Sequence, residues 1–118
     1  MNKDPREHIC YIARLTYDRF LTDAAGGNMS IREGDRIFCT PKYSGTYNQW
    51  RLNPEQIVVT DMDGRQLDGT GELSREFEMH LRIYQAFPDA GGIVHAHPPL
   101  HVDFCTCGAF NSAHTGAE

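Results

Sequence analysis

The sequence predicts a single α/β domain in which helices pack in layers around one mixed or antiparallel sheet. Two segments have the capped, amphipathic pattern that is typical of helices, and short β-branched stretches separated by tight turns lie between and after them. With 118 residues, the chain is long enough for one hydrophobic core and too short for two comfortable ones. We therefore expect residues 1–118 to form one domain.

The N-terminal segment carries a complete start signal for a helix. Asp4 is a good N-cap, Pro5 occupies the first helical position and Glu7 the third. Apolar residues then recur at helical spacing to about Leu21. This pattern predicts a helix whose role is packing.

Four short strands are expected between the two helices, next to turns that contain glycine or proline. They cover residues 31–32, 36–39, 57–60 and 65–67. Glu33-Gly34-Asp35 and Asp63-Gly64 predict hairpin turns, and Asn53-Pro54-Glu55 predicts one helical turn. Trp50, the single tryptophan, is expected to anchor the packing.

Two polar loops interrupt this pattern. Residues 24–30 contain Gly26-Gly27, and paired glycines let the backbone turn sharply and approach a ligand closely. The N–H groups of such a loop can bind an anion, although an ordinary turn is the commoner interpretation. The second loop, residues 40–45, contains hydroxyl groups on both sides of Lys42.

The segment that follows combines a carboxylate with a helix. Ser74 predicts the N-cap of an amphipathic helix that ends before Pro88. Glu76, His80 and Tyr84 form one stripe of this helix at intervals of four residues. We expect structural roles for His80 and Tyr84, because a helix that packs on a sheet needs such residues.

A pair of histidines follows in Ile-Val-His-Ala-His, residues 93–97, which reads as a buried strand that Pro98 stops. Alternate residues of a strand share a face, so His95 and His97 would point the same way. Two neutral imidazoles suit one zinc ion, and Glu76 would lie beside it. Histidines in an isolated strand are more often core residues, but the combination with the other motifs favours a metal.

Composition and charge exclude several classes of partner. The net charge is −5 and there is no continuous basic stripe, so a small-molecule ligand fits better than nucleic acid. No apolar run approaches a membrane span and no signal peptide is evident, which predicts a cytoplasmic protein without membrane contact. The cysteines are expected to be reduced thiols. They are Cys10, Cys39, Cys105 and Cys107.

Two other chemical interpretations are weaker. Cys105-Thr106-Cys107, with His101 and His114 nearby, has the ligand types of a structural zinc site, but small buried residues following a helix over 100–107 explain them as well. The acidic pairs Asp61/Asp63 and Glu76/Glu78 raise the alternative of a two-carboxylate hydrolase. Asp61 and Asp63 are better explained by their turn, and on a helix Glu78 points away from Glu76.

Taken together, the motifs resemble the class II aldolase/adducin family, which includes the zinc-dependent fuculose-phosphate and rhamnulose-phosphate aldolases and ribulose-phosphate 4-epimerase. The resemblance spans roughly residues 5–108 and implies a three-layer α/β/α domain with a central, mostly antiparallel or mixed sheet. The motifs that carry it are Gly27-Asn28-Met29-Ser30, Thr40-Pro41 with Ser44-Gly45, Ser74-x-Glu76 with His80 and Tyr84, and His95-Ala96-His97-Pro98.

The resemblance also implies roles for individual residues. His95 and His97 would be ligands of Zn²⁺ or another divalent metal, and Glu76 would be the catalytic acid/base. Five positions match substrate- or phosphate-binding residues of the family: Asn28, Thr40, Ser44, Gly45 and Ser74. Arg75 stands where family members have a second serine, and Ala25-Gly26 where they have a threonine. Arg75 could replace the lost hydroxyls with a bidentate contact to an anion.

The implied activity is that of a zinc-dependent aldolase-type lyase that cleaves a phosphorylated ketose, such as a fuculose-phosphate-like sugar. The cation would stabilise an enediolate, and Glu76 would move the proton, with a pKa raised by partial burial. A sugar-phosphate 4-epimerase, a dehydratase and a non-catalytic adducin-like binding module are the alternatives.

The length of the chain adds one further expectation. Members of the family are about twice as long and assemble as tetramers, and their third zinc histidine lies beyond Glu118, the last residue here. His101 and His114 come too early to match it. The resemblance therefore implies a homo-oligomer that is truncated at its C-terminal end, with an incomplete metal site and an activity that the truncation could abolish.

Overall fold

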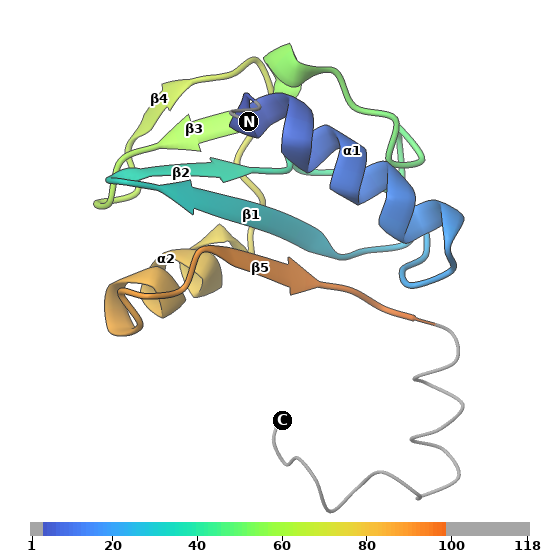
Figure 1. Cartoon of the computed structure of the whole chain (residues 1–118). Coiled ribbons are helices and arrows are strands. Elements are labelled where there is room, and N and C mark those ends of the chain that lie inside the picture. Colours follow the sequence, from blue (N-terminus) through green and yellow to red (C-terminus); the bar gives the residue numbers. More distant parts are fainter. Residues whose placement is uncertain (1–3, 99–118) are drawn as a thin grey trace, which may run out of the picture.

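Five strands form one antiparallel sheet with a helix on each face (Figure 1). The strands are β1 (Asn28–Glu33), β2 (Arg36–Cys39), β3 (Val58–Thr60), β4 (Gln66–Asp68) and β5 (Gly92–His95), in the spatial order β4-β3-β2-β1-β5. The helices are α1 (Pro5–Asp18), α2 (Phe77–Ala86) and a single 3-10 turn, η1 (Pro54–Gln56). This arrangement confirms the predicted three-layer α/β/α fold with its antiparallel sheet.

The structure, a computed structural model, describes residues 4–98. The predicted helix over residues 100–107 lies outside this range, as do His101, Cys105, Cys107 and His114. Cys10 and Cys39, which lie within it, are both free thiols. Burial raises the pKa of the Cys39 thiol to about 12, so this thiol stays protonated. Neither α1 nor α2 has the length and apolar character that a membrane span requires.

Helix α1 begins where its start signal predicts. The Asp4 carboxylate accepts a hydrogen bond from the Arg6 amide at 2.9 Å, and Pro5 follows it at the first helical position. The helix ends at Asp18, three residues before the predicted end, because Phe20 adopts a left-handed conformation with φ of 60°. Such a residue ends the helical hydrogen-bond pattern.

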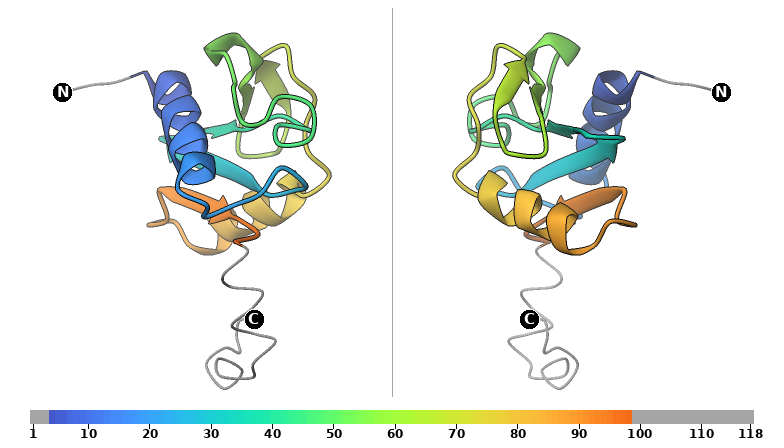
Figure 2. Two further views of the ribbon diagram at one scale, coloured as in Figure 1. Left: turned by 90° about the vertical axis from the view of Figure 1, so that its right-hand side faces the viewer. Right: turned by 90° about the vertical axis from the view of Figure 1, so that its left-hand side faces the viewer.

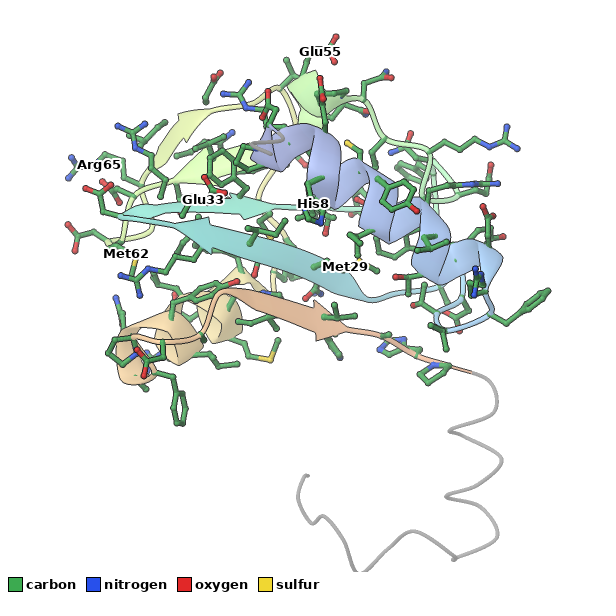
Figure 3. The ribbon with its side chains drawn as sticks, viewed as in Figure 1. His8, Met29, Glu33, Glu55, Met62 and Arg65 are labelled. Carbon is green, nitrogen blue, oxygen red and sulfur yellow. The ribbon has the colours of Figure 1, made fainter. Side chains whose placement is uncertain are left out.

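The core between α1 and the sheet contains the predicted tryptophan anchor. Trp50 is fully buried in a cluster with Ile9, Ala13 and Met29, and its indole N–H donates to the Asp23 carbonyl at 2.8 Å. Figure 3 shows Met29 on β1, on the face of the sheet that α1 covers. The cluster fixes α1 and the 23–27 segment against the same face of the sheet.

Strand β1 starts three residues earlier than the local pattern predicts. Asn28, Met29 and Ser30, expected in a loop, are strand residues because they pair with β5, a segment more than 60 positions away. The β1–β2 hairpin itself is confirmed, with Glu33 opposite Arg36. Asn28 is therefore held by the sheet and not by a mobile loop.

The turns around β3 and β4 follow their predictions. Asp61 Oδ1 accepts hydrogen bonds from the amides of Asp63 and Arg65, each at 2.9 Å, and these bonds hold the pKa of Asp61 below its ordinary value. The Asp61 carboxylate thus stabilises the turn, as the simpler interpretation of this acidic pair requires. In Figure 3, Arg65 and Glu33 lie at the end of the sheet where the hairpins turn.

Helix α2 begins later than predicted, at Phe77. Ser74 precedes it in a turn, where its hydroxyl accepts a hydrogen bond from the Glu76 amide at 3.1 Å. Glu76 is consequently the N-cap residue, and it lies before the helix rather than on it. The buried face of α2, Phe77, Leu81 and Tyr84, packs on the side of the sheet opposite α1 (Figure 2).

Strand β5 differs from its prediction in two ways. It lies at the edge of the sheet in the described part of the chain, and Val94 is 56% exposed, so the strand is not buried. It also ends at His95, which leaves His97 outside the strand. The period-two argument for a shared face therefore does not apply to the two histidines.

Gly27 lies where the start of β1 passes the end of β5. Its φ is +102°, and a Cβ atom there would be 2.8 Å from the His95 carbonyl oxygen. Gly34, in the β1–β2 turn, has a φ of +62° and open space around a Cβ. Both positions favour glycine for backbone reasons, but only Gly27 lacks room for a side chain.

We predict that Gly27→Ala lowers the free energy of unfolding by about 3 kcal/mol, whereas Gly34→Ala costs about 1 kcal/mol. The difference reflects the contact with the His95 backbone, because both variants bear left-handed strain. Urea unfolding followed by circular dichroism measures both values. Equal losses would show that β1 and β5 are not packed as closely as described.

Candidate active site

The pairing of β1 with β5 brings the first residues of the site together. Asn28 lies directly opposite His95, and Ser30 lies opposite Ile93. Opposite residues of an antiparallel pair project to the same face of the sheet. Asn28, Ser30 and His95 therefore share one face, which is the face that α2 covers.

Glu76 reaches this face from the N-cap of α2. Its Oε1 accepts a hydrogen bond from the Asn28 side-chain amide at 2.6 Å, and the same oxygen lies 2.8 Å from His95 Nδ1. The second contact has the distance of an ion pair, but its angles do not suit a hydrogen bond, and Nδ1 is buried without a hydrogen-bond partner. His95 Nδ1 is therefore a buried nitrogen without a hydrogen-bond partner, next to a carboxylate.

The electrostatics of Glu76 differ from the expectation. The hydrogen bond from Asn28 holds the pKa of the Glu76 carboxyl below its ordinary value, while burial acts in the opposite direction and His95 adds to the lowering. The prediction that burial raises this pKa is wrong, because the side chain is 51% exposed and accepts a hydrogen bond from an amide. At neutral pH Glu76 is a carboxylate, a group that can accept a proton.

The two histidine side chains lie close together although only one belongs to the strand. Their ring centroids are 5.1 Å apart, with an edge-to-face angle of 78° between the planes. The His97 amide donates to the Thr22 hydroxyl at 3.3 Å, and a Cβ atom at Gly26 would be 2.7 Å from the His97 ring. His97 is thus positioned by the glycine loop, and His95 by the sheet.

His95 and His97 have suitable donor atoms for a divalent metal, but the two side chains alone do not form a complete metal site. Two adjacent imidazoles, one with an unsatisfied buried nitrogen, are suitable ligands for zinc. Within residues 4–98, however, no group of three or more histidine, cysteine or acidic side chains has the geometry to hold a metal ion. A catalytic zinc site uses three protein ligands and one open position.

A polar pocket of about 370 Å³ opens beside Glu76. It is lined by parts of the 25–28 and 41–46 loops, by residues 74–76 and by His97. Five of the predicted binding residues are among the lining: Asn28, Ser44, Gly45, Ser74 and Arg75. Lys42 also lines the pocket, so two basic side chains and one carboxylate face the same space.

Three of the predicted hydroxyl groups are engaged within the protein. Thr40 is fully buried, its hydroxyl accepts from the Met29 amide at 3.0 Å, and it is absent from the pocket lining. Thr40 thus stabilises the start of β1, and its contact with substrate stays a prediction. Ser44 donates to the Pro41 carbonyl and Ser74 caps the Glu76 amide, although both still line the pocket.

A row of buried polar side chains lies behind Asn28. His80 Nε2 contacts Asn28 Oδ1, His80 Nδ1 lies 2.6 Å from the Ser30 hydroxyl, and Ser30 lies 2.8 Å from the Tyr84 hydroxyl. Burial, with a smaller effect of His95, lowers the pKa of His80 to about 4. The expectation of structural roles for His80 and Tyr84 fits these contacts. The sequence analysis names Ser30 in a family motif but assigns it no role, because its partners His80 and Tyr84 lie 50 and 54 positions away.

Known proteins resemble this chain in sequence and in fold. The Class II Aldolase and Adducin N-terminal domain matches residues 7–115. An L-fuculose phosphate aldolase of Methanococcus maripaludis is 38% identical over 86 residues, which is 73% of this chain and 45% of that protein. A methylthioribulose-1-phosphate dehydratase of Methylococcus capsulatus is 43% identical over 77 residues, 64% of this chain and 36% of that protein.

A solved structure of L-fuculose 1-phosphate aldolase is also similar. It superposes with a TM-score of 0.76 and 25% sequence identity over 88% of this chain and 49% of that one. The chain belongs to the class II aldolase and adducin family, because the family domain covers most of its length. It spans less than half the length of the curated relatives that it matches.

The low pKa of His80 makes stability depend on pH. The folded chain binds a proton at His80 only near pH 4, whereas the unfolded chain binds it near the ordinary value of 6.5. The free energy of unfolding should therefore fall as the pH falls from 6.5 to 4, and this shift corresponds to about 3 kcal/mol.

We predict that His80→Gln loses less unfolding free energy on acidification than the unaltered chain does, because glutamine cannot be protonated. Urea unfolding of both proteins at pH 7 and pH 4.5 isolates the contribution, because the carboxylates are common to both. An equal loss of stability in the two proteins would contradict a neutral, buried His80.

Proposed function

We propose that this chain forms the catalytic part of a zinc-dependent aldolase-type lyase that cleaves a phosphorylated ketose. The observation that supports this most directly is the position of Glu76. Its ionised carboxylate lies 2.8 Å from His95, beside His97, at a pocket that Lys42 and Arg75 also line. A proton acceptor, an imidazole and two cations line this cavity, and a second imidazole lies behind Glu76, a combination that suits an anionic sugar.

The phosphate end of the substrate would lie between Lys42 and Arg75. Arg75 can make a bidentate contact with phosphate, and Lys42 adds a second positive charge from the opposite loop. The backbone of Gly26 and Gly27 lines the same pocket, so main-chain groups are accessible to the ligand there. This arrangement would compensate for the threonine and serine hydroxyls that the motif lacks.

His95 and His97 would hold the metal. A divalent cation bound there would act as a Lewis acid toward the carbonyl group of the substrate. The protein's own part is to hold the two imidazoles next to each other, His95 through the β1–β5 pairing and His97 through its packing on Gly26. A third ligand would come from outside residues 4–98.

Glu76 would accept and return the proton that the reaction moves. Its pKa is held below the ordinary value by Asn28, so the carboxylate is already in the accepting form at neutral pH. Asn28 also fixes the position of Oε1, which leaves Oε2 available to a ligand. The half-exposed side chain gives the substrate direct access to this group.

A dehydratase is the second candidate, because a methylthioribulose-1-phosphate dehydratase shares 43% identity over 77 residues. Both reactions start from a phosphorylated ketose and need a base beside a metal.

Self-association is a further part of the proposal, since the edge of β5 is uncovered in the described chain and carries an exposed Val94.

We predict that the chain binds Zn²⁺ and that His95→Ala and His97→Ala each weaken this binding at least tenfold. Gly26→Ala should also weaken it, because the new Cβ displaces the His97 ring. Isothermal titration with zinc measures the affinities. His8→Ala, which removes an exposed histidine of α1, is the matched control and should bind as the unaltered chain does. Equal affinities in all four variants would contradict this metal site.

We predict that Glu76→Gln lowers kcat for cleavage of L-fuculose 1-phosphate by a factor of about 10² to 10⁴, the usual contribution of a general base. Arg75→Ser should raise KM more than it lowers kcat. The control is Glu78→Gln, because Glu78 pairs with Arg82 on the exposed side of α2. Release of the aldehyde is followed with a coupled dehydrogenase.

The outcomes separate the candidate functions. Loss of water from methylthioribulose 1-phosphate without aldol cleavage would favour the dehydratase. Zinc-loaded chain that turns over neither substrate would support a non-catalytic binding module. A Glu76→Gln variant with unchanged kcat would overturn the assigned base.

A further inference from the structure

A directional chain of hydrogen bonds runs from the core of the domain to Glu76. It passes from Tyr84 to Ser30 at 2.8 Å, from Ser30 to His80 at 2.6 Å, through His80 to Asn28, and from Asn28 to Glu76 at 2.6 Å. The first four side chains are buried, with exposed fractions of 0%, 2%, 0% and 3%. Asn28 and Glu76 both line the pocket, and Glu76 is the exposed end of the chain of hydrogen bonds.

The carboxylate of Glu76 determines which group donates and which accepts in every hydrogen bond of the chain. The Asn28 side-chain nitrogen can only donate and the Glu76 oxygen accepts, so the Asn28 oxygen must face His80. His80 Nε2 therefore carries the hydrogen and donates it to Asn28 Oδ1. A neutral imidazole with a proton on Nε2 has an acceptor at Nδ1.

The remaining two bonds are fixed in the same way. Because His80 Nδ1 accepts, the Ser30 hydroxyl must donate to it. The Ser30 oxygen then has a lone pair for the Tyr84 hydroxyl, which acts as the donor. Burial raises the pKa of Tyr84, so its hydroxyl keeps its proton.

The alternative arrangements are unfavourable. A flipped Asn28 side chain would place two oxygen acceptors 2.6 Å apart at Glu76. A protonated His80 would be a fully buried cation whose direct partners, Asn28 and Ser30, are both neutral. A single donor–acceptor pattern therefore satisfies all five side chains.

We propose that His80, with Ser30 and Tyr84 behind it, is a positioning residue: as its neutral Nε2–H tautomer it fixes the orientation of the Asn28 amide, and through it the Glu76 carboxylate. This role rests on the proposed function only in naming Glu76 as the reacting carboxylate. The network itself requires neither metal nor substrate.

The position of Glu76 explains why such a support is needed. Glu76 lies in the turn before α2, its side chain is half exposed, and it makes no capping hydrogen bond of its own. Asn28 is the first residue of β1, where its backbone pairs with His95 of β5, and its side chain is 3% exposed. The hydrogen bonds therefore restrain the side chain of Glu76 at the pocket, because they connect it through Asn28 to residues buried in the core.

The tautomer of His80 is the first test. Long-range proton–nitrogen NMR spectra of the ¹⁵N-labelled full chain at pH 7 distinguish the two neutral tautomers and the charged ring. We expect a single Nε2–H form. In Asn28→Ala, where the constraint from Glu76 is removed, the Nδ1–H form should become populated, because Ser30 can then accept a hydrogen bond. An Nδ1–H or charged His80 in the unaltered chain would overturn the proposal.

Solvent exchange of the Asn28 side-chain NH₂ group is the second test. His80→Phe removes the partner of Asn28 Oδ1, so we expect exchange to accelerate about tenfold, the effect of losing one net hydrogen bond. His80→Gln can still present an amide donor to Asn28 and should restore most of the protection. Protection that His80→Phe leaves unchanged would contradict the positioning role.

The two tests remain decisive under adverse outcomes. If circular dichroism shows that His80→Phe is unfolded, the tautomer in the unaltered chain and in Asn28→Ala still decides the proposal. If the chain cleaves no sugar phosphate, the proposed function fails, while the NMR results report on the network alone.

Discussion

The antiparallel pairing of β1 with β5 is the constraint on which the site depends. It places Asn28 opposite His95 and sets both on the face that α2 covers. A shift of one residue in this register would turn His95 and Ile93 to the other face and expose Ile93, which now packs against the α2 cluster. The apolar contacts of Ile93 therefore stabilise the register that the polar residues need.

The two ionisable groups linked by Asn28 differ in charge because they differ in burial. Glu76 is ionised at the pocket, where water and the Asn28 amide stabilise it, and His80 is neutral in the core, where a charge would be costly. Asn28 connects the two environments, because its amide presents a donor to the carboxylate and an acceptor to the imidazole. An uncharged side chain with both functions suits this boundary better than an acid or a base would.

Local signals in the sequence predicted the elements whose causes are local. The start of α1, the β1–β2 hairpin and the turn at Asp61 follow from caps and turn residues next to them. The early start of β1 and the edge position of β5 depend on partners far along the chain, so no local pattern contains them. The pKa of Glu76 was mispredicted for the same reason, since its lowering comes from Asn28, 48 residues away.

The two imidazoles of the site have separate supports, the sheet for His95 and the glycine loop for His97. Their spacing is therefore not a fixed property of a strand. A change of side-chain volume in the loop can move one ring while the other keeps its place, which offers protein engineers a way to tune the distance between the two nitrogen donors, and with it the choice of cation, without rebuilding the β-sheet.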